Sequence, residues 1–544
     1  MTAAGSEKVI IIGAGVAGLA TAGLLAREGY EVTVLERHER TGGRAGVLER
    51  DGFRFDTGPS WYLMPQIFDH FFHLMGTSAA EQLDLVALDP GYRVFAEPEV
   101  GGELASFIDV PRGEAAVRKV FSRLEPGAGE VLGQYLESAR DATDMAEKYF
   151  LYNPFRSARS LLTREVLQNL GKLAGLLGTS LETHIARRFR HPVLRQILGY
   201  PSVFLGTHPA QAPAMYHLMS ALDLDSGVLY PRGGFWTLMQ KLQALARDAG
   251  AKIVTEANVT AITTKRRLRL SRKSRAVTGV AWADRDGGAN HLAADIVVSA
   301  ADLHHTETQL LSAPDRSYPQ RWWGKRQSGP GAVLTFLGVS GQLTELPHHS
   351  LFFTRDWDAN FAAIFGSQPT VPEPASLYVC RASATDPQAA PAGFEQLFIL
   401  TPVPADAAIG RGGADGEGDG QVEEISRCSI EQVAQWAGIA DLEQRITVRE
   451  TIGPADFARD YSAWSAGMLG PSHTLAQSAM FRAQNASKKV AGLYYAGGST
   501  APGIGVPMCL ISAELVLKHL RGDKTAGPLL RNYKSVGSVP VGRS

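Results

Sequence analysis

The chain has 544 residues, 44% of them hydrophobic and 20% charged, and its 54 Lys and Arg nearly balance its 55 Asp and Glu. This composition is typical of a folded globular protein, and the length suits three or four compact units or two larger ones with interleaved segments. A net charge of −1 gives no reason to expect nucleic acid as a partner. Three scattered cysteines without a C-x-x-C pair argue against a disulfide-built fold, a dithiol relay and a structural zinc site, so we expect no metal and a reducing, cytoplasmic setting.

The first long apolar stretch, residues 9–26, carries no charged side chain and has the length of a membrane span or signal-peptide core. Its four glycines, and the β-branched residues before Gly13, instead predict a strand at 9–12, a tight turn and a helix at 19–27. A second strand follows at 31–35, which completes a βαβ unit. No other stretch is apolar enough to span, so we expect any membrane contact to be peripheral.

Further along, β-rich segments at 252–262 and 295–299 suit a parallel sheet assembled from separated parts of the chain, and residues 140–195 read as helical. A second sheet is predicted between 330 and 403. Residues 405–424 are glycine-rich and acidic, and we expect a mobile surface loop there. The tail, 525–544, is expected to be disordered.

The glycine turn at the start is a G-x-G-x-x-G motif formed by Gly13, Gly15 and Gly18. The first glycine permits the turn, the second lets a pyrophosphate approach the backbone, and the third lets the helix pack on the strand. Glu36 ends the second strand, where a carboxylate accepts hydrogen bonds from a ribose diol. The alternative is a packing turn with a solvated surface glutamate.

A second glycine turn, Thr41-Gly42-Gly43-Arg44, follows Glu36 and Arg37 and supplies Arg44 as a bidentate partner for the same pyrophosphate. Here the sequence resembles FAD-binding flavoproteins of the glutathione reductase type, which have E-x-x-x-x-x-G-G-R after the first βαβ unit. We find no second G-x-G-x-x-G for a nicotinamide. The chain is therefore expected to take electrons from an organic substrate.

Near the other end, residues 493–512 read as a strand, a glycine- and proline-rich turn and a helix. The turn resembles the C-terminal flavin motif of the bacterial and fungal phytoene desaturase family, L-Y-x-x-G-x-x-T-x-P-G-x-G-x-P. The resemblance covers residues 8–520. Other stretches in family order are 55–59, 230–234, 298–302, the His348-His349 pair, 384–387, 402–404 and 477–482. Ala301 departs from the asparagine expected there, which leaves a flavin contact at this position open, and 405–424 looks like an insertion.

The resemblance implies an α/β fold with a doubly wound, glutathione-reductase-like FAD domain, a substrate domain with its own sheet, and a helical cap that associates with membrane. The FAD domain is expected at 1–85, 228–305 and 480–524, the substrate domain at 86–139 and 306–479, and the cap at 140–227. The cofactor contacts are expected at Gly13, Gly15, Gly18, Glu36, Arg37, Gly43, Arg44, Gly58, Pro59, Val259, Gly497, Gly498, Gly505, Val506, Pro507 and Met508.

The implied activity is FAD-dependent desaturation of phytoene and partly desaturated carotenoids towards lycopene, at the cytoplasmic face of a membrane. One carbon of a C–C bond flanking the polyene gives a hydride to the flavin, the adjacent carbon loses a proton, and oxygen or a quinone reoxidises the flavin. An apolar tunnel matters more for this chemistry than a polar triad. Candidates for its wall are Trp61, Tyr62, Phe204, Tyr216 and Trp236, and possible acid–base groups are His217, His348 and His349. The sequence designates no catalytic base.

In the cap, residues 160–195 carry an excess of four positive charges, including Arg187, Arg188 and Arg190. Anionic headgroups attract such a surface, and Leu176, Leu177, Phe189 and Leu194 are candidates for insertion into the interface. Core leucines beneath a solvated basic face are the alternative.

Two other functions remain open at this point. One keeps the fold and changes the reaction to a carotenoid isomerase, a ketolase, or a desaturase of thirty-carbon or hydroxylated carotenoids. The other is a non-catalytic prenyl-binding escort protein that resembles GDP-dissociation inhibitors. The intact glycine turn at 497–507 and Arg44 count against the escort. Amine oxidases also share the N-terminal half, but the motifs at 384–387, 402–404 and 502–507 favour a polyene substrate.

Overall fold

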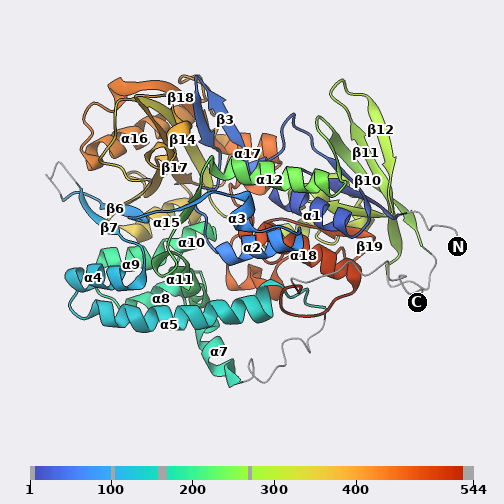
Figure 1. Cartoon of the computed structure of the whole chain (residues 1–544), viewed down its shortest axis with the longest axis horizontal. Helices are drawn as coiled ribbons and strands as arrows, with labels where there is room; N and C mark the ends of the chain where they lie inside the picture. Colours follow the sequence, from blue (N-terminus) through green and yellow to red (C-terminus); the bar gives the residue numbers. More distant parts are fainter. Residues whose placement is uncertain (1–5, 100–104, 157–167, 268–272, 531–544) are drawn as a thin grey trace.

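The computed structural model describes residues 6–99, 105–156, 168–267 and 273–530. Figure 1 shows three parts: a region of helices, a seven-stranded sheet, and the part that contains α1 and the predicted glycine turns. Among the described residues, no helix combines the length and the apolar character needed to cross a bilayer. The long apolar segment near the N-terminus is instead β1 (Lys8–Ile12) and α1 (Val16–Arg27), joined by the first glycine turn.

A five-stranded parallel sheet holds the glycine turns, in the order β20-β13-β1-β2-β9. The other strands are β20 (Leu493–Tyr495), β13 (Ile296–Ser299), β2 (Glu31–Leu35) and β9 (Lys252–Val254). All four pairings are parallel, so the expected sheet from separated segments is present. Its strands come from the three stretches expected for the FAD domain.

The two faces of this sheet are covered differently. Val9 and Ile11 of β1 pack with the helices α1, α12 (Gly234–Asp248) and α18 (Val506–Arg521). Ile10 and Ile12 point the other way, into a core with another sheet. In that sheet β10 (Asn258–Arg266), β11 (Arg275–Ala283) and β12 (Ala289–Ala293) are antiparallel, and β19 (Val490–Ala491) pairs with β11 in parallel. Because alternate side chains leave a strand on opposite faces and both faces are covered, β1 is apolar and buried from Val9 to Ile12, after the exposed Lys8. One face is therefore covered by a sheet, whereas a doubly wound arrangement has helices on both.

A second sheet of seven strands has the order β18-β14-β17-β16-β15-β6-β7. Its strands are β18 (Ile446–Ile452), β14 (Gly331–Ser340), β17 (Phe394–Val403), β16 (Leu377–Cys380), β15 (His349–Phe353), β6 (Tyr92–Ala96) and β7 (Ser106–Val110). One face packs on α16 (Gly420–Ala437). The opposite face, with Leu351, Phe353 and Tyr378, belongs to the core shared with the helices.

The helical region lies below this sheet in Figure 1. Its helices are α4 (Glu114–Leu124), α5 (Ala128–Ala146), α7 (Leu170–Gly178), α8 (Leu181–Ala186), α9 (Pro192–Gly199), α10 (Pro201–Phe204) and α11 (Met219–Leu224). The expected cap boundary at residue 140 lies inside α5. Residues 157–167, which include part of the expected basic segment, lie outside the described residues.

Two expectations for surface segments need correction. Residues 405–424 are not a free loop: the Gly413 N–H donates to Thr451 Oγ1 (2.9 Å), the Thr451 N–H donates to the Gly413 carbonyl (2.9 Å), and the last residues begin α16. Acidic side chains here have partners, since Asp415 pairs with Arg50. In the helical region, Phe189 and Leu194 are fully buried because they belong to its core. Leu176 is also buried, which leaves Leu177 as the exposed one of the four candidates. Of the expected tail, only 525–530 is described.

Candidate functional site

A cavity of about 1080 Å³ opens at the carboxyl ends of β1, β2 and β13, the edge at which ligands bind in open α/β sheets. Every residue expected to contact the cofactor lines it, with the exception of Gly18. The cavity continues from these loops to residues of the seven-stranded sheet and of the helical region. Its two parts differ in polarity and are described in turn.

The three glycines of the first turn have separate physical roles. Gly13 has φ +94°, a conformation that favours glycine. Gly15 caps α1 at the cavity wall, and a Cβ there would meet nothing nearer than the Gly42 carbonyl oxygen at 3.8 Å. Gly18 is hidden behind the turn, where a Cβ would lie 1.9 Å from the Gly13 carbonyl oxygen. The third glycine therefore lets the helix pack on the strand, and the second leaves open space for a ligand.

Glu36 is buried at the end of β2 and lines the cavity. Its Oε2 accepts a hydrogen bond from the Ala14 N–H (2.7 Å), and its Oε1 accepts one from the His38 N–H (3.0 Å). A carboxylate has about four acceptor positions, so capacity remains for two hydroxyls of a diol. The glycine turn and the acid are thus held in register, as the ribose assignment requires. Arg37 donates to the hydroxyl of Ser462 (3.1 Å), the residue that follows α17 (Pro454–Tyr461).

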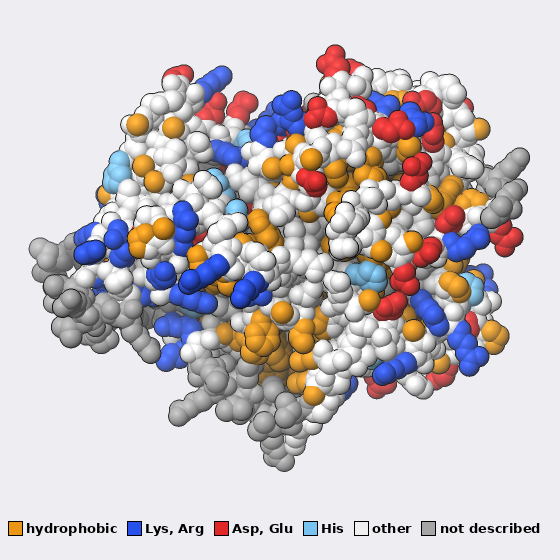
Figure 2. Space-filling model, turned by 180° about the vertical axis from the view of Figure 1, so that it is seen from behind, with side chains coloured by type: hydrophobic (Ala, Val, Ile, Leu, Met, Phe, Trp, Pro, Cys, Tyr) orange, Lys and Arg blue, Asp and Glu red, His pale blue; other side chains and the backbone are white. Residues whose placement is uncertain are grey.

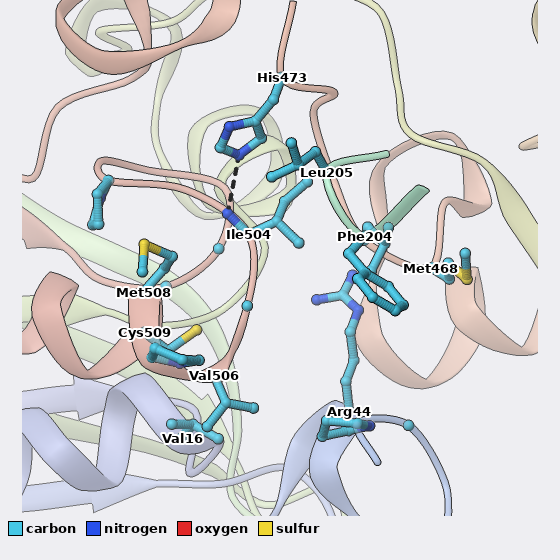
Figure 3. Close-up of a pocket in the computed structure, with 18 of the residues that line it drawn as sticks. Val16, Arg44, Phe204, Leu205, Met468, His473, Ile504, Val506, Met508 and Cys509 are labelled. Atoms are coloured by element: carbon cyan, nitrogen blue, oxygen red, sulfur yellow. Dashed lines mark hydrogen bonds between the residues drawn. The ribbon is translucent and has the colours of Figure 1, made fainter. Parts of the chain in front are cut away.

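Arg44 supplies a cation that pairs with no carboxylate of the described residues. Figure 3 shows its side chain extending into the pocket towards Phe204. Its Nε and Nη2 are buried and have no hydrogen-bond partner, and its guanidinium lies 5.6 Å from the centre of the Tyr461 ring. A buried guanidinium with free N–H groups is costly unless an anion completes it. Gly58 brings the two segments together, because a Cβ there would lie 2.2 Å from the Arg44 carbonyl oxygen.

The C-terminal glycine turn places the start of α18 at the cavity. Gly505, at φ +115°, caps this helix, and Val506, Pro507 and Met508 form its first turn. Arg482, from a motif whose role the sequence left open, anchors the turn: it is fully buried and donates to the carbonyls of Gly498 (2.6 Å), Thr500 (3.1 Å), Gln477 (3.1 Å) and Pro471 (3.1 Å). Burial lowers the pKa of Arg482 to about 10. The free amides of the helix N-terminus then form a second anion-binding element.

His473 also fixes this turn, and sequence reasoning missed it. The Ile504 N–H donates to His473 Nε2 (3.2 Å), a bond drawn in Figure 3. Burial and the nearby Arg482 keep the pKa of His473 well below its usual value, so the ring is neutral and carries its proton on Nδ1. Nδ1 donates to the Tyr216 hydroxyl (2.7 Å), which donates to the Ser478 hydroxyl (2.9 Å). The only sequence signal was a histidine shortly before the motif that contains Arg482.

The second part of the cavity is apolar. Of the five aromatic candidates, Trp61, Phe204 and Tyr216 line it. Tyr62 is instead stacked on Phe68 at 4.0 Å in the core, and Trp236 packs beside the glycine turns. The wall also includes Leu173, Leu177, Met215, Leu351, Phe353, Trp357, Phe361, Ile364, Phe365, Leu400, Met468, Leu475, Met480 and Phe481.

The acid–base candidates lie away from this wall. His217 is buried and hydrogen bonded to the Ala214 carbonyl (2.9 Å) and the Ser138 hydroxyl (3.1 Å). His348 and His349 are buried behind Trp61, and burial lowers the pKa of His348 to about 3. In the described part of the chain, the carboxylates that line the cavity are Glu36, Asp302 and Asp460, all beside the dinucleotide motifs. Ala301 lines the cavity with a methyl group, which makes no hydrogen bond.

A buried carboxyl group stands behind the aromatic wall. Asp223 Oδ2 accepts hydrogen bonds from Tyr92 (3.1 Å) and Tyr200 (2.7 Å), and both tyrosine rings pack on Trp61. Burial raises the pKa of Asp223 to about 7 in spite of these bonds. The group positions the wall without lining the cavity.

Comparison with known proteins indicates the family of the chain. The model of the family of flavin-containing amine oxidoreductases matches residues 16–516. A carotenoid 3,4-desaturase from Haloarcula japonica is 37% identical over 519 residues, which covers 95% of this chain and 98% of the relative. A phytoene desaturase from Fusarium fujikuroi is 31% identical over 537 residues, with 95% and 90% covered. Among solved structures, a double mutant of putrescine oxidase superposes with a TM-score of 0.59 at 15% identity, covering 95% of this chain and 98% of that one.

The chain therefore belongs to the flavin-containing amine oxidoreductase family. It is an oxidoreductase whose cofactor is FAD. The residues present fit this cofactor, because an unpaired buried guanidinium, two helix N-termini and an open glycine cradle meet at one end of the cavity.

Proposed function

We propose that the protein is a carotenoid desaturase that removes two hydrogens from a C–C bond flanking the polyene of phytoene or a partly desaturated carotenoid. One observation carries the proposal: a single cavity is lined at one end by the dinucleotide-binding loops and elsewhere by aliphatic and aromatic side chains. A long, rigid and apolar substrate matches such a wall, since burial of its surface needs no polar partner. The names of the two relatives support the same substrate class.

Bound FAD would supply the hydride acceptor for this oxidation. The protein's own residues perform the rest: Glu36, Arg44 and the N-terminus of α18 hold the cofactor, and the aromatic wall orients the substrate and excludes water. His473 holds the turn at 502–505, because its neutral ring accepts the Ile504 N–H. No carboxylate of the described residues lines the apolar part, so we assign no catalytic base there.

The non-catalytic escort alternative is less well supported. A carrier that binds only a prenyl chain has no use for a buried, unpaired guanidinium beside two helix N-termini. The carotenoid isomerase and the ketolase keep the same cofactor site, so the site alone does not separate them from a desaturase.

An anaerobic single-turnover experiment separates these reactions. The FAD-loaded protein is mixed with phytoene in liposomes without oxygen or quinone, and the flavin and carotenoid spectra are followed together. Desaturation bleaches the flavin and shifts the carotenoid bands to longer wavelength in equal molar amounts. An isomerase changes the carotenoid without bleaching the flavin, and a ketolase needs oxygen. No change in either spectrum with phytoene or its partly desaturated products would contradict the proposal.

We further propose that the cavity opens onto a lipid surface. Four hydrophobic side chains line the cavity and are also solvent-exposed: Leu177 (40%), Leu475 (44%), Met480 (44%) and Phe481 (58%). We call them the apolar rim. Figure 2 shows hydrophobic side chains gathered at the lower part of one face, in the region where α7 lies in Figure 1. Exposed apolar groups around a cavity mouth suit entry of a lipid-soluble substrate.

Flotation with liposomes tests the apolar rim. Leu177→Ser together with Phe481→Ser should reduce co-flotation severalfold, since each change removes apolar area from the interface. Phe107→Ser is the matched control, because Phe107 is 54% exposed on β7 and does not line the cavity. Equal flotation of the rim variant and the control would count against the rim, whatever the enzyme's substrate.

A further inference from the structure

The His348-His349 pair, which the proposed reaction leaves unused, lies in a buried cluster with Cys380. One ring nitrogen of each histidine and the Cys380 sulfur lie within 4.8 Å of one another. All three side chains are buried, with exposed fractions of 4% or less. Among the His, Cys, Asp and Glu side chains of the described residues, these three form the group that is close enough together to hold a metal ion.

The outer nitrogens of both rings have no partner in the part of the chain that the structure describes. His348 Nε2 and His349 Nε2 are buried and make no hydrogen bond. A buried polar atom without a partner destabilises a folded protein, and most buried polar atoms are hydrogen bonded. A ligand that bonds both nitrogens would remove this cost.

The inner nitrogens are already fixed, as they are in metal sites. His348 Nδ1 is hydrogen bonded to Thr385 Oγ1 (2.8 Å), and His349 Nδ1 is hydrogen bonded to the Tyr378 hydroxyl (2.8 Å). Metal-binding histidines commonly use one ring nitrogen in this way, which orients the ring and leaves the other nitrogen for the metal. Because Trp61 stacks on His349 at 4.6 Å and 11°, the ring has little freedom to turn away.

The backbone brings the sulfur to the same place. In the antiparallel pair β15–β16, His349 and Cys380 are direct partners. His348 precedes the strand, and its carbonyl accepts the Arg381 N–H (2.8 Å). The ligand types therefore converge from two neighbouring strands, although 31 positions separate His349 from Cys380.

We propose that His348 Nε2, His349 Nε2 and Cys380 Sγ bind one Zn²⁺ ion. Imidazole and thiolate are the ligands that zinc prefers, at about 2.0–2.1 Å for nitrogen and about 2.3 Å for sulfur. One nitrogen of each ring lies within 4.8 Å of the sulfur and of the other ring's nitrogen, so the side chains must move inward to bind one ion. Binding releases the thiol proton to solvent, and no electron transfer is involved.

Charged groups around the cluster are of both signs. The guanidinium of Arg381 and the carboxylate of Asp386 act on His348, and the carboxyl group of Asp56 acts on Cys380. Asp386 is itself paired with Arg54 (3.0 Å). The site lies outside the cavity, directly behind Trp61, so the ion would join β15 to β16 and stiffen the aromatic wall.

The test begins with tag-free, FAD-loaded protein dialysed against Zn²⁺ and then against buffer, with metal content measured by mass spectrometry. We expect one zinc per chain in the wild type, and its loss in Cys380→Ala and His349→Phe, the second of which keeps a ring against Trp61. Cys428→Ala is the matched control, because Cys428 lies on α16 away from the cluster and should leave the zinc content unchanged. No more zinc in the wild type than in the buffer, or equal zinc in all variants, would overturn the proposal.

Cobalt substitution provides a readout that does not depend on the variants folding. Wild-type protein loaded with Co²⁺ should show a thiolate-to-cobalt charge-transfer band and intense d–d bands in the red, measured as a difference from the Zn²⁺-loaded protein with equal flavin. Their absence would overturn the site. Cobalt bound elsewhere on the chain without a cysteine ligand would give no charge-transfer band. The band therefore distinguishes the proposed site from such binding.

Discussion

Replacement of Gly15 by Val separates the cofactor role of the first glycine turn from its structural role. Gly15 has φ −77° and ψ −175°, an extended conformation that valine adopts readily. A Cβ there meets no atom nearer than 3.8 Å, so the protein itself has room for the side chain. The loss of glycine at a helix N-cap costs about 1 kcal/mol of folding stability. We therefore expect a folded variant with the side chain standing where the pyrophosphate must lie.

The expected loss of affinity follows from the hydrogen bonds that we expect the pyrophosphate to make with the amides at the start of α1. Each bond to a charged group contributes about 1.5–3 kcal/mol. Loss of one or two of them weakens FAD by about 2–5 kcal/mol, a rise in Kd of roughly 30-fold to 5,000-fold. Gly18→Ala should behave differently, because its Cβ would lie 1.9 Å from the Gly13 carbonyl oxygen and damage the fold itself.

FAD titration of the apoprotein, followed by flavin fluorescence, measures the effect, and circular dichroism with a thermal melt verifies the fold. Gly324→Val is the matched control: Gly324 is exposed after α14 (Gln320–Trp323), and its Cβ would meet nothing nearer than 3.7 Å. A folded Gly15→Val variant that binds FAD with wild-type affinity would refute the assignment of this turn.

Four further predictions concern other parts of the molecule. Glu36→Ala should weaken FAD by about 1.5–3 kcal/mol in the same titration without unfolding the protein, and unchanged affinity would remove the ribose assignment. Because burial raises the folded-state pKa of Asp223 from 3.8 to about 7, its contribution to stability is greatest below pH 4 and is lost as the pH rises to 7, by about 4 kcal/mol. Asp223→Asn should flatten that part of the curve of unfolding free energy against pH, and a curve identical to wild type would contradict the shift. Charge reversal of Arg187, Arg188 and Arg190 to Glu should reduce co-sedimentation with anionic liposomes at low salt but not at high salt, with little change in FAD content. Finally, NADPH added without oxygen should not bleach the flavin, and bleaching at catalytic rates would show that a nicotinamide site exists.

The parallel sheet could be predicted from the sequence because its signals are local. The strand at 9–12 and the glycine turn are contiguous, and Glu36 lies one strand further on. The same short-range logic placed the turn at 497–507 before a helix, which is α18. Because β1 is buried on both faces, residues 9–12 form an unbroken hydrophobic run that is visible in the sequence. The sequence did not predict which element covers the face that contains Ile10, because an apolar side chain packs equally well against a helix or a sheet.

The parts of the site that escaped prediction depend on contacts between distant segments. His473 acts on Ile504 only because the chain returns to the cavity 31 residues later. Phe189 resembles an interfacial residue in its basic sequence context, yet it packs against Phe121 and Tyr135 in the core. A leucine- and arginine-rich helical segment has the same pattern in both settings, so tertiary packing decides.

The distribution of ionisable groups around the cavity connects the fold to the chemistry. Carboxylates and guanidinium groups lie at the carboxyl ends of the parallel strands, where the turns present free amides, whereas the wall from the seven-stranded sheet and the helices is mostly aliphatic and aromatic. Asp223 and the His348-His349 pair are polar, but they stand behind that wall and are held there by Tyr92, Tyr200 and Tyr378. Because a polyene offers no hydrogen-bonding group along its length, selectivity for it must come from the shape of the wall, and buried polar groups behind the wall can set that shape without touching the substrate.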